Sequence, residues 1–376
     1  MDFNLSEDQK LIRDMSREFA EKELKDYAVE IDEKREFPKN VLKKMSQLGL
    51  LGLAIPEKFS GNEMDILSIV IAIEEIAKVC ASTAVICAIH NLVVSYAISQ
   101  FGTEEQKRKH LPKLAQGKEI SGISLMEPDA ESLITDLDLI TSQQGEKYIL
   151  NGKKRLMLGG NTADLFLVFA KDEQSKIKIF LIEKGMDGFI FDKEENTLGL
   201  RGIKSCELSF EKCQIPKENL LGKDMEQTLY LKKISDMGKI AISAVAIGIA
   251  QSALDMSIEY SLQRRQFGKT IAEFQAIQWM LAQMESDITG ARSTLYYAVA
   301  LKGESKSTGK ECAIAKLTSA QVAVKTTINA IQVRGGYGYM KDFPLERMFR
   351  DAKSMEFIMG TLQTQKDIIA EKLLKS

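Results

Sequence analysis

Two short stretches of the sequence contain residue types that suit the binding of phosphate groups. Arg264 opens Arg264-Arg265-Gln266-Phe267-Gly268, and Gly335-Gly336 lies within Gln332-Val333-Arg334-Gly335-Gly336-Tyr337-Gly338-Tyr339. An arginine guanidinium is planar and permanently charged, so it can pair with pyrophosphate oxygens. Adjacent glycines at a helix end let backbone N–H groups approach the same oxygens. Together the two stretches suit a dinucleotide, although each alone also fits a solvated arginine or a helix C-cap.

Other common catalytic groups are scarce. The chain has only two histidines, His90 and His110, so a histidine-rich metal site is nearly excluded and a catalytic triad has few candidates. His90 follows an apolar run and is expected to be a buried structural histidine. The odd number of cysteines, with no CxxC pair, favours reduced thiols in a reducing compartment. The five are Cys80, Cys87, Cys206, Cys213 and Cys312.

The composition is that of an ordinary soluble globular protein. The 376 residues are 44% hydrophobic and 28% charged, with a formal net charge of −2. Nothing in this balance favours binding to nucleic acid. The longest apolar stretch, residues 240–250, is shorter than the roughly 20 residues that span a bilayer, so it predicts a buried helix. The N-terminus is acidic and lacks a signal-peptide core, and we expect a cytoplasmic protein.

The hydrophobic pattern changes period twice along the chain and predicts an α+β fold of three domains. Residues 1–118 have a helical pattern, with capping boxes at Ser6/Gln9 and Thr103/Gln106. Residues 119–226 alternate in short segments punctuated by turns, which is typical of a β domain. Residues 227–376 return to the helical period, with about four helices at 229–263, 274–301, 310–333 and 361–374.

Within the β domain, Asn151-Gly152 is a strong signal for a two-residue hairpin turn. It predicts that strands at 147–150 and 153–158 pair with each other. Further strands are predicted at 164–170, 176–183 and 206–215.

The motifs, taken in their order and spacing, closely resemble the acyl-CoA dehydrogenase family over essentially the whole chain. Besides the two phosphate-binding stretches, the resemblance includes Arg350-Asp351-Ala352-Lys353 shortly before Gly360-Thr361. It extends to the opening LSEDQK, to LGLLGLAIPEKFSG at 48–61 and to IPKENLLG at 215–222. The resemblance implies an N-terminal helical domain, a middle β-barrel or sheet domain and a C-terminal four-helix bundle.

The resemblance also implies the cofactor FAD, clamped between subunits of a tetramer. By matching positions, Arg264, Phe267 and Gln275 would hold the FAD of one subunit. Gln332, Gly335 and Gly336 would reach the adenine side of a neighbour's FAD, and Thr361 would contact the cofactor as well. The long helices carry more apolar surface than one bundle face needs, which also favours a homotetramer or a hetero-oligomer.

The chain departs from the family where the base should be. The family's usual base is a glutamate just before the Gly-Thr pair, and here Met359 precedes Gly360-Thr361. A thioether cannot accept the substrate's α-proton. Some members carry the base on the long helix instead, and the matching position in Asp236-Met237-Gly238-Lys239 is Gly238. Both familiar base positions are empty, and Glu356, one helical turn before Met359, is a weak substitute.

The residues that would face the flavin have also changed. Met126 replaces a hydroxyl residue, and Leu156-Met157-Leu158 replaces the family's Trp-Ile-Thr strand. On the substrate side, Ser132 matches a residue that meets the pantetheine arm. Lys239 replaces an arginine near coenzyme A and loses its bidentate geometry. The residues expected to bind substrate are Ser132, Asp236, Lys239 and Gly360.

Two main hypotheses follow for the function. The first is an FAD-dependent oxidoreductase acting on an acyl thioester, carried by coenzyme A or an acyl carrier protein, with electron-transfer flavoprotein as electron partner. The second is a non-catalytic subunit of a hetero-oligomeric acyl-CoA dehydrogenase. A third, an FAD-binding protein with another chemistry such as oxygen-using oxidation, has no direct support in the sequence. With both base positions empty, we expect little or no desaturation of simple saturated acyl-CoAs.

Overall fold

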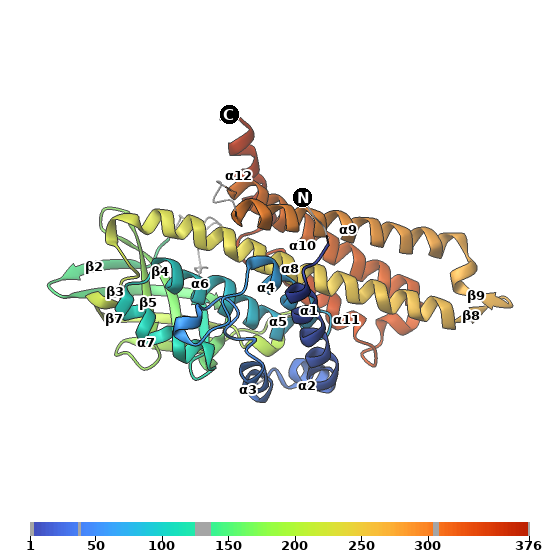
Figure 1. Ribbon diagram of the computed structural model, residues 1–376, viewed down its shortest axis with the longest axis horizontal. Coiled ribbons are helices and arrows are strands. Elements are labelled where there is room, and N and C mark those ends of the chain that lie inside the picture. The colour runs from blue at the N-terminus through green and yellow to red at the C-terminus, as the bar shows by residue number, and fades with distance from the viewer. Residues whose placement is uncertain (1–3, 37–38, 125–136, 304–307, 375–376) are drawn as a thin grey trace.

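The computed structural model describes residues 4–36, 39–124, 137–303 and 308–374, and the side chains of Leu156 and Met157 also lie outside the description. Helices, a β-sheet and a second set of helices follow one another along the chain, as predicted (Figure 1). The sheet lies at one end of the molecule. The long C-terminal helices extend away from the sheet as an arm, while the N-terminal helices pack along the base of this arm.

The N-terminal region is built from short helices around one apolar core. Both predicted capping boxes are present: the Ser6 side chain accepts a hydrogen bond from Gln9 N, and the Thr103 side chain accepts one from Gln106 N. The helical segments are α1 (Glu7–Phe19), η1 (Ala20–Leu24), α2 (Lys25–Lys34), α3 (Lys39–Gln47), η2 (Glu57–Phe59), α4 (Ile66–Ala77), α5 (Ala81–Ala88), η3 (Ile89–Ser95), α6 (Tyr96–Phe101) and α7 (Glu104–Ala115).

His90 joins this helical region to the first strand of the sheet. It is fully buried, with Nε2 3.2 Å from Leu114 O, and its Nδ1 accepts a hydrogen bond from Ser121 N at 3.4 Å. Burial lowers the pKa of this imidazole to about 4, so the ring is neutral at pH 7. The expectation of a buried structural histidine is confirmed.

The middle region is a mixed sheet of seven strands, in the order β1-β4-β2-β3-β7-β6 with β5 added beside β4. Strand β4 runs parallel to β1 and β2, and the other pairs are antiparallel. The strands are β1 (Ser121–Ser124), β2 (Ile140–Gln144), β3 (Lys147–Met157), β4 (Leu165–Asp172), β5 (Ile177–Glu183), β6 (Phe189–Glu194) and β7 (Cys206–Pro216).

The predicted hairpin turn at Asn151-Gly152 is wrong. Strand β3 runs through both residues without reversing, and its register against β7 shifts between Leu150 and Gly152. Gly152 has φ 134°, and Lys212 N donates to Asn151 Oδ1 at 2.8 Å, so the pair forms a bulge that β7 stabilises. The chain reverses instead before Lys147, at a turn that contains Gly145 with φ 61°.

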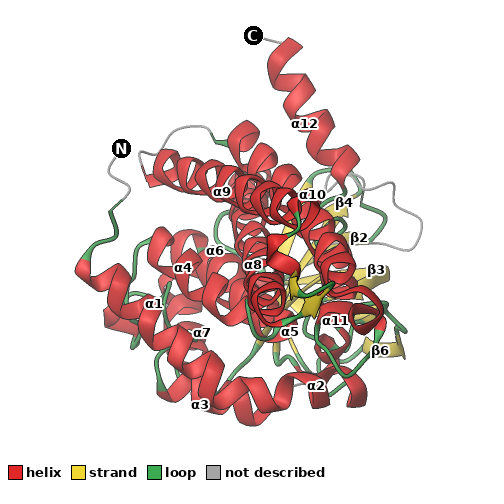
Figure 2. Cartoon of the chain, turned by 90° about the vertical axis from the view of Figure 1, so that its right-hand side faces the viewer, coloured by secondary structure: helices red, strands yellow, loops and turns green. Residues whose placement is uncertain are grey.

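The C-terminal region is dominated by α8 (Gln227–Gln263), α9 (Gln275–Gly303) and α10 (Gly309–Arg334). A small hairpin of β8 (Arg265–Gln266) and β9 (Lys269–Thr270) forms the tip of the arm, and η8 (Ile271–Glu273) leads back into α9 (Figure 1). Helix α11 (Leu345–Ser354) packs beside the bundle. Helix α12 (Leu362–Leu374) projects from the body and leaves Leu373 and Leu374 exposed (Figure 2).

Among the described residues, two helical segments are long and apolar enough to cross a membrane by length and composition, Ala81–Phe101 and Asp224–Gln263. Their most apolar windows are 94% and 89% buried inside the protein. The second contains residues 240–250, which were predicted to form a buried helix. Apolar side chains on all sides of a helix are typical of a helix packed in a core.

Candidate functional site

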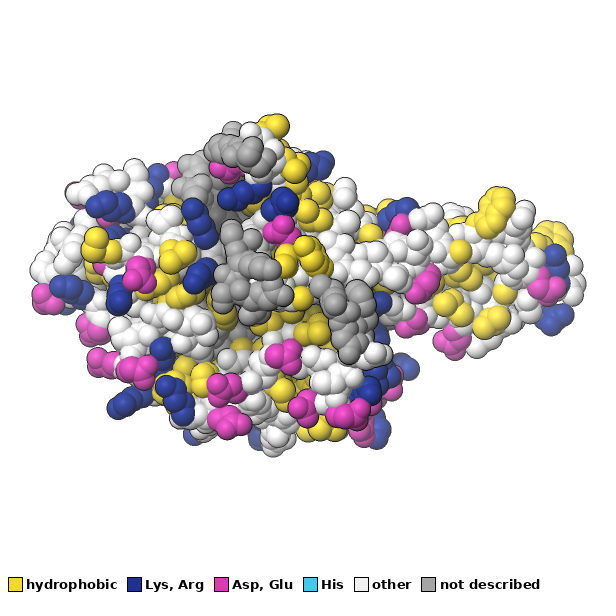
Figure 3. All heavy atoms as spheres, turned by 45° about the horizontal axis from the view of Figure 1, so that its top comes forward, with side chains coloured by type: hydrophobic (Ala, Val, Ile, Leu, Met, Phe, Trp, Pro, Cys, Tyr) yellow, Lys and Arg dark blue, Asp and Glu magenta, His cyan; other side chains and the backbone are white. Residues whose placement is uncertain are grey.

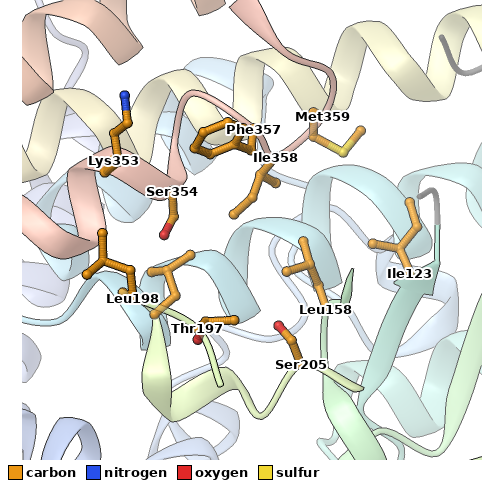
Figure 4. Close-up of a pocket in the computed structure, with 12 residues that line it drawn as sticks. Ile123, Leu158, Thr197, Leu198, Ser205, Lys353, Ser354, Phe357, Ile358 and Met359 are labelled. Atoms are coloured by element: carbon orange, nitrogen blue, oxygen red, sulfur yellow. The ribbon is translucent and has the colours of Figure 1, made fainter. Parts of the chain in front are cut away.

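An apolar cavity of about 260 Å³ lies between the sheet and the segment that follows α11. In Figure 4, Ile123 and Leu158 line it from the β domain, and Phe357, Ile358 and Met359 face them from the loop after α11. Two backbone hydrogen bonds of 3.1 Å between Ile123 and Leu158 fix this wall of the cavity. The remaining lining residues are Thr197, Leu198, Gly199, Leu200, Ser205, Lys353 and Ser354.

The Arg350-Asp351 motif positions the loop that forms another wall of the cavity. The Arg350 guanidinium donates to both carboxylate oxygens of Asp32, at 2.9 and 2.7 Å, and to Leu198 O at 3.2 Å. Asp351 Oδ1 accepts a hydrogen bond from Leu200 N at 2.6 Å. Burial raises the pKa of the Asp351 carboxyl to about 6. In the sequence, these two residues served only as part of a family motif. The structure shows that they join α11 to α2 and to the loop at residues 198–200 that lines the cavity.

The two positions predicted to have lost a base, 359 and 238, lie next to each other in space. Met359 is 2% exposed and stands on the loop after α11, whereas Gly238 belongs to α8. A Cβ atom added to Gly238 would lie only 1.8 Å from Met359 Cε. The structure therefore brings together the two positions at which the resemblance predicts a base.

Two fully buried polar side chains hold the loop that carries Met359. Lys316 Nζ donates to Gly360 O at 2.8 Å, and Gln365 Nε2 donates to Met359 O and Thr361 O, each at 3.3 Å. Burial, together with repulsion from Lys239, lowers the pKa of Lys316 to about 7. Neither residue lies in a recognised motif, so no signal in the sequence pointed to either of them. Thr361, predicted to contact the cofactor, accepts a hydrogen bond from Thr364 N at 3.2 Å.

The charged residues expected near the substrate are largely paired with one another. Lys239 is 3% exposed, and its Nζ lies 3.2 Å from Asp236 Oδ1, while Lys302 Nζ lies 3.2 Å from Asp236 Oδ2. Glu356, the weak substitute for the base, pairs with Lys353 at 2.5 Å and is absent from the cavity lining. Met126 and Ser132 lie outside the described residues, so their predicted roles stay predictions, as does the contact of Leu156 with the flavin.

The phosphate-binding stretches come together at the far end of the arm. The Arg264 guanidinium lies 5.8 Å from the ring of Tyr337, in the loop that follows Gly335-Gly336. Phe267, in the hairpin tip, is 91% exposed. Gln275 begins α9, and Gln332 lies exposed in the last turn of α10.

The two glycines of this loop differ in what requires them. Gly335 has φ 62° and caps α10 by donating its N–H to Gln332 O, so the helix-cap interpretation accounts for it. Gly336 has no positive φ, and a Cβ added there would meet nothing within 4 Å among the described residues. The packing of the described residues does not require glycine at 336.

These two ends suit the two halves of a flavin dinucleotide. The apolar cavity offers flat contact surface for a ring system, and Arg264 with the open Gly335-Gly336 loop offers charge and backbone N–H groups for a pyrophosphate. Leu158 lines the cavity as an apolar group where the family has a hydroxyl. The described residues fit a flavin dinucleotide, with an apolar side chain at Leu158 where the resemblance predicts a polar contact to the flavin ring.

Three domain models of one family match the chain. They are the acyl-CoA dehydrogenase N-terminal domain at residues 6–118, the middle domain at 122–213 and the C-terminal domain at 230–374. The short-chain specific acyl-CoA dehydrogenase of Clostridium acetobutylicum is 41% identical over 100% of both chains.

Solved structures agree with the sequence comparison. Butyryl-CoA dehydrogenase from Megasphaera elsdenii superimposes with a TM-score of 0.96 at 35% identity, covering 100% of both chains. A chain of the structure described as "Electron transferring flavoprotein of Acidaminococcus fermentans: Towards a mechanism of flavin-based electron bifurcation" has a TM-score of 0.96 at 39% identity, with the same coverage. Family members are FAD-dependent flavoproteins, as the sequence predicted for the cofactor. This chain, with its three matched domains, belongs to the acyl-CoA dehydrogenase family.

Proposed function

We propose that the protein is an FAD-dependent oxidoreductase that acts on an acyl thioester without the carboxylate base of ordinary dehydrogenation. The observation that carries the proposal is the apolar cavity that ends at Met359, next to Gly238. A flavin bound there would supply the acceptor or donor for a hydride. Two relatives are named for short-chain acyl-CoA or butyryl-CoA, so a short acyl group is the first substrate to test.

The residues of this chain would divide the work between binding and exclusion of water. Arg264 neutralises pyrophosphate charge, and the apolar walls around Leu158 and Ile358 keep water from the reacting atoms. Lys316 and Gln365 hold the loop under the reacting carbons. Because Met359 cannot take a proton, the α-proton must leave through another group, or the substrate must carry its own base.

The proposed assembly is a tetramer in which the arm of one chain completes the cofactor site of another. Within one chain the tip of the arm and the sheet lie at opposite ends (Figure 1), so one cofactor that touches both needs a second chain. Apolar side chains are visible along the arm in Figure 3, and several of its aromatic and aliphatic residues are exposed. They include Ile258, Leu262, Phe267, Trp279, Tyr337 and Tyr339. A monomer by light scattering at micromolar concentration would contradict this assembly.

Electron-transfer flavoprotein is the proposed redox partner, in line with the description of one structural relative. The carrier of the acyl group is coenzyme A or an acyl carrier protein, since both present the same pantetheine arm.

The rival function is a non-catalytic subunit that lends cofactor contacts to a partner. Two features favour this rival. Arg264 and Gly335-Gly336 are retained at the tip of the arm, and the Met359 side chain fills the space beside Gly238. The visible absorbance spectrum of the purified protein discriminates between the two. Flavin bands, present on purification or after addition of FAD, support the oxidoreductase. A colourless protein that acquires no bands from added FAD supports the partner role.

A further inference from the structure

Gly238 has no requirement for glycine in its own helix. It lies inside α8, where glycine costs roughly 0.5–1 kcal/mol relative to alanine, and its φ is not positive. The three atoms nearest to an added Cβ all belong to Met359: Cε at 1.8 Å, Sδ at 2.9 Å and Cγ at 3.1 Å. The thioether therefore occupies the space that any side chain at position 238 would need.

The resemblance also implies that the reacting carbon of a thioester lies in that space. A base at position 359 and a base at position 238 remove the same α-proton only if both side chains point at one common atom. The α-carbon therefore belongs between the two positions. Here the Met359 side chain fills the interval, because it touches the backbone of α8 at Gly238.

We propose that Met359 is a specificity-determining residue whose thioether closes the acyl end of the site, with Gly238 as the notch that receives it. This inference rests on the proposed action on a thioester. It makes positions 238 and 359 one packing unit, since a side chain at 238 requires the Met359 side chain to move. An acyl chain enters only when the thioether leaves its notch.

The backbone conformation of residues 359–361 directs the Met359 side chain towards Gly238. Met359 has φ 60°, a left-handed conformation that is unusual for a residue with a side chain, and it is followed by Gly360 with φ 94°. The hydrogen bonds from Lys316 and Gln365 to the three carbonyls of residues 359–361 maintain this turn. The buried side chains of Lys316 and Gln365 therefore hold the turn in the conformation that directs Met359 towards α8.

The first test is a double-mutant cycle read by thermal unfolding of the protein as purified. Gly238→Ala should lower the Tm of the wild type, because its methyl group collides with Met359. In the Met359→Ala background the same substitution should leave the Tm unchanged or raise it. Met355→Ala is the matched control background: Met355 is also fully buried, and its removal should not rescue Gly238→Ala. An equal loss of Tm in all three backgrounds would overturn the interlock.

The second test measures the binding of coenzyme A and butyryl-CoA by calorimetry. The wild type and Met355→Ala should bind butyryl-CoA no more tightly than coenzyme A. Met359→Ala should prefer butyryl-CoA, by about fourfold for each methylene that becomes buried. An equal preference for butyryl-CoA in the wild type and in Met359→Ala would overturn the role of Met359 and leave the thioester function standing. Absence of binding of either ligand to every variant would overturn the action on coenzyme A thioesters, and the specificity role with it.

Discussion

The tip of the arm and the surroundings of Met359 each have a glycine and a cation, and the two regions use them in opposite ways. At the tip, Gly336 faces open space, and the exposed loop places Arg264 beside Tyr337. Around Met359, the space beside Gly238 is filled by the Met359 side chain. Lys316 is fully buried against the loop that carries Met359. The tip keeps its groups available to a molecule from outside. The groups around Met359 are satisfied within the chain, which is the contrast that the following variants test.

The largest expected effect concerns proton removal. Met359→Glu removes the thioether from its notch and adds a base, so it should raise the turnover of butyryl-CoA with an artificial electron acceptor, by up to the roughly 10²–10⁴-fold that a positioned base contributes. Met359→Gln, which has nearly the same shape and no basic group, is the control and should stay as inactive as the wild type. Ready turnover by the wild type would contradict the loss of the base, and Glu356→Gln would then be the next variant to assay.

The next effect concerns the buried cation. Lys316 has a pKa of about 7 in the folded protein and an ordinary value of 10.5, so the folded state binds fewer protons between these values. The stability of the wild type should therefore rise with pH across this window, and the penalty of burying the charge is fully present below about pH 7. The gap corresponds to about 5 kcal/mol.

Lys316→Met removes this titration but also the hydrogen bond to Gly360 O, which is worth about 0.5–1.5 kcal/mol. We expect the variant to be more stable than the wild type near pH 7 and to lose that advantage towards pH 10. Urea unfolding at several pH values measures both curves. Parallel curves would show that Lys316 titrates normally.

Cofactor affinity should respond at the tip of the arm. Arg264→Ala should weaken FAD binding by about 1.5–3 kcal/mol, the contribution of a charge-assisted hydrogen bond, without loss of the fold. Arg265→Ala is the neighbouring control, since Arg265 Nη2 already donates to Gly268 O at 3.3 Å. Flavin fluorescence titration gives both affinities. If Arg264→Ala binds FAD as the wild type does, the role assigned to Arg264 is wrong.

The smallest expected effect is a difference in stability between alanine variants of Gly336 and Gly338, which lie in one loop. Gly336→Ala should change the unfolding free energy by less than about 1 kcal/mol, because its Cβ meets nothing within 4 Å, and should still weaken FAD binding. Gly338→Ala should destabilise the fold, because its Cβ would lie 2.4 Å from Ile331 O. Thermal unfolding and FAD titration of both variants test this contrast. A large loss of stability in Gly336→Ala would show that the loop is packed rather than open.

Local signals predicted the regular elements well. The long helix expected at 229–263 is α8 (Gln227–Gln263), and the capping boxes at Ser6 and Thr103 are present. The Asn151-Gly152 turn failed because pairing with β7 outweighed a local preference, and β6 (Phe189–Glu194) was not predicted because half of its residues are charged. Helix α11 was also missed as an element, although its Arg350-Asp351 motif was noted.

The sequence by itself determined the α, β, α order and the family, and it led to the prediction that positions 359 and 238 lack a base. Periodicity and motif spacing are local properties of the chain, so they could be read without coordinates. Only the tertiary structure decided that Met359 and Gly238, more than a hundred residues apart, share one volume. It also decided that Lys316 lies under the loop and that Gly336 faces open space. Contacts between distant segments depend on how helices and loops pack, and no spacing along the chain encodes them.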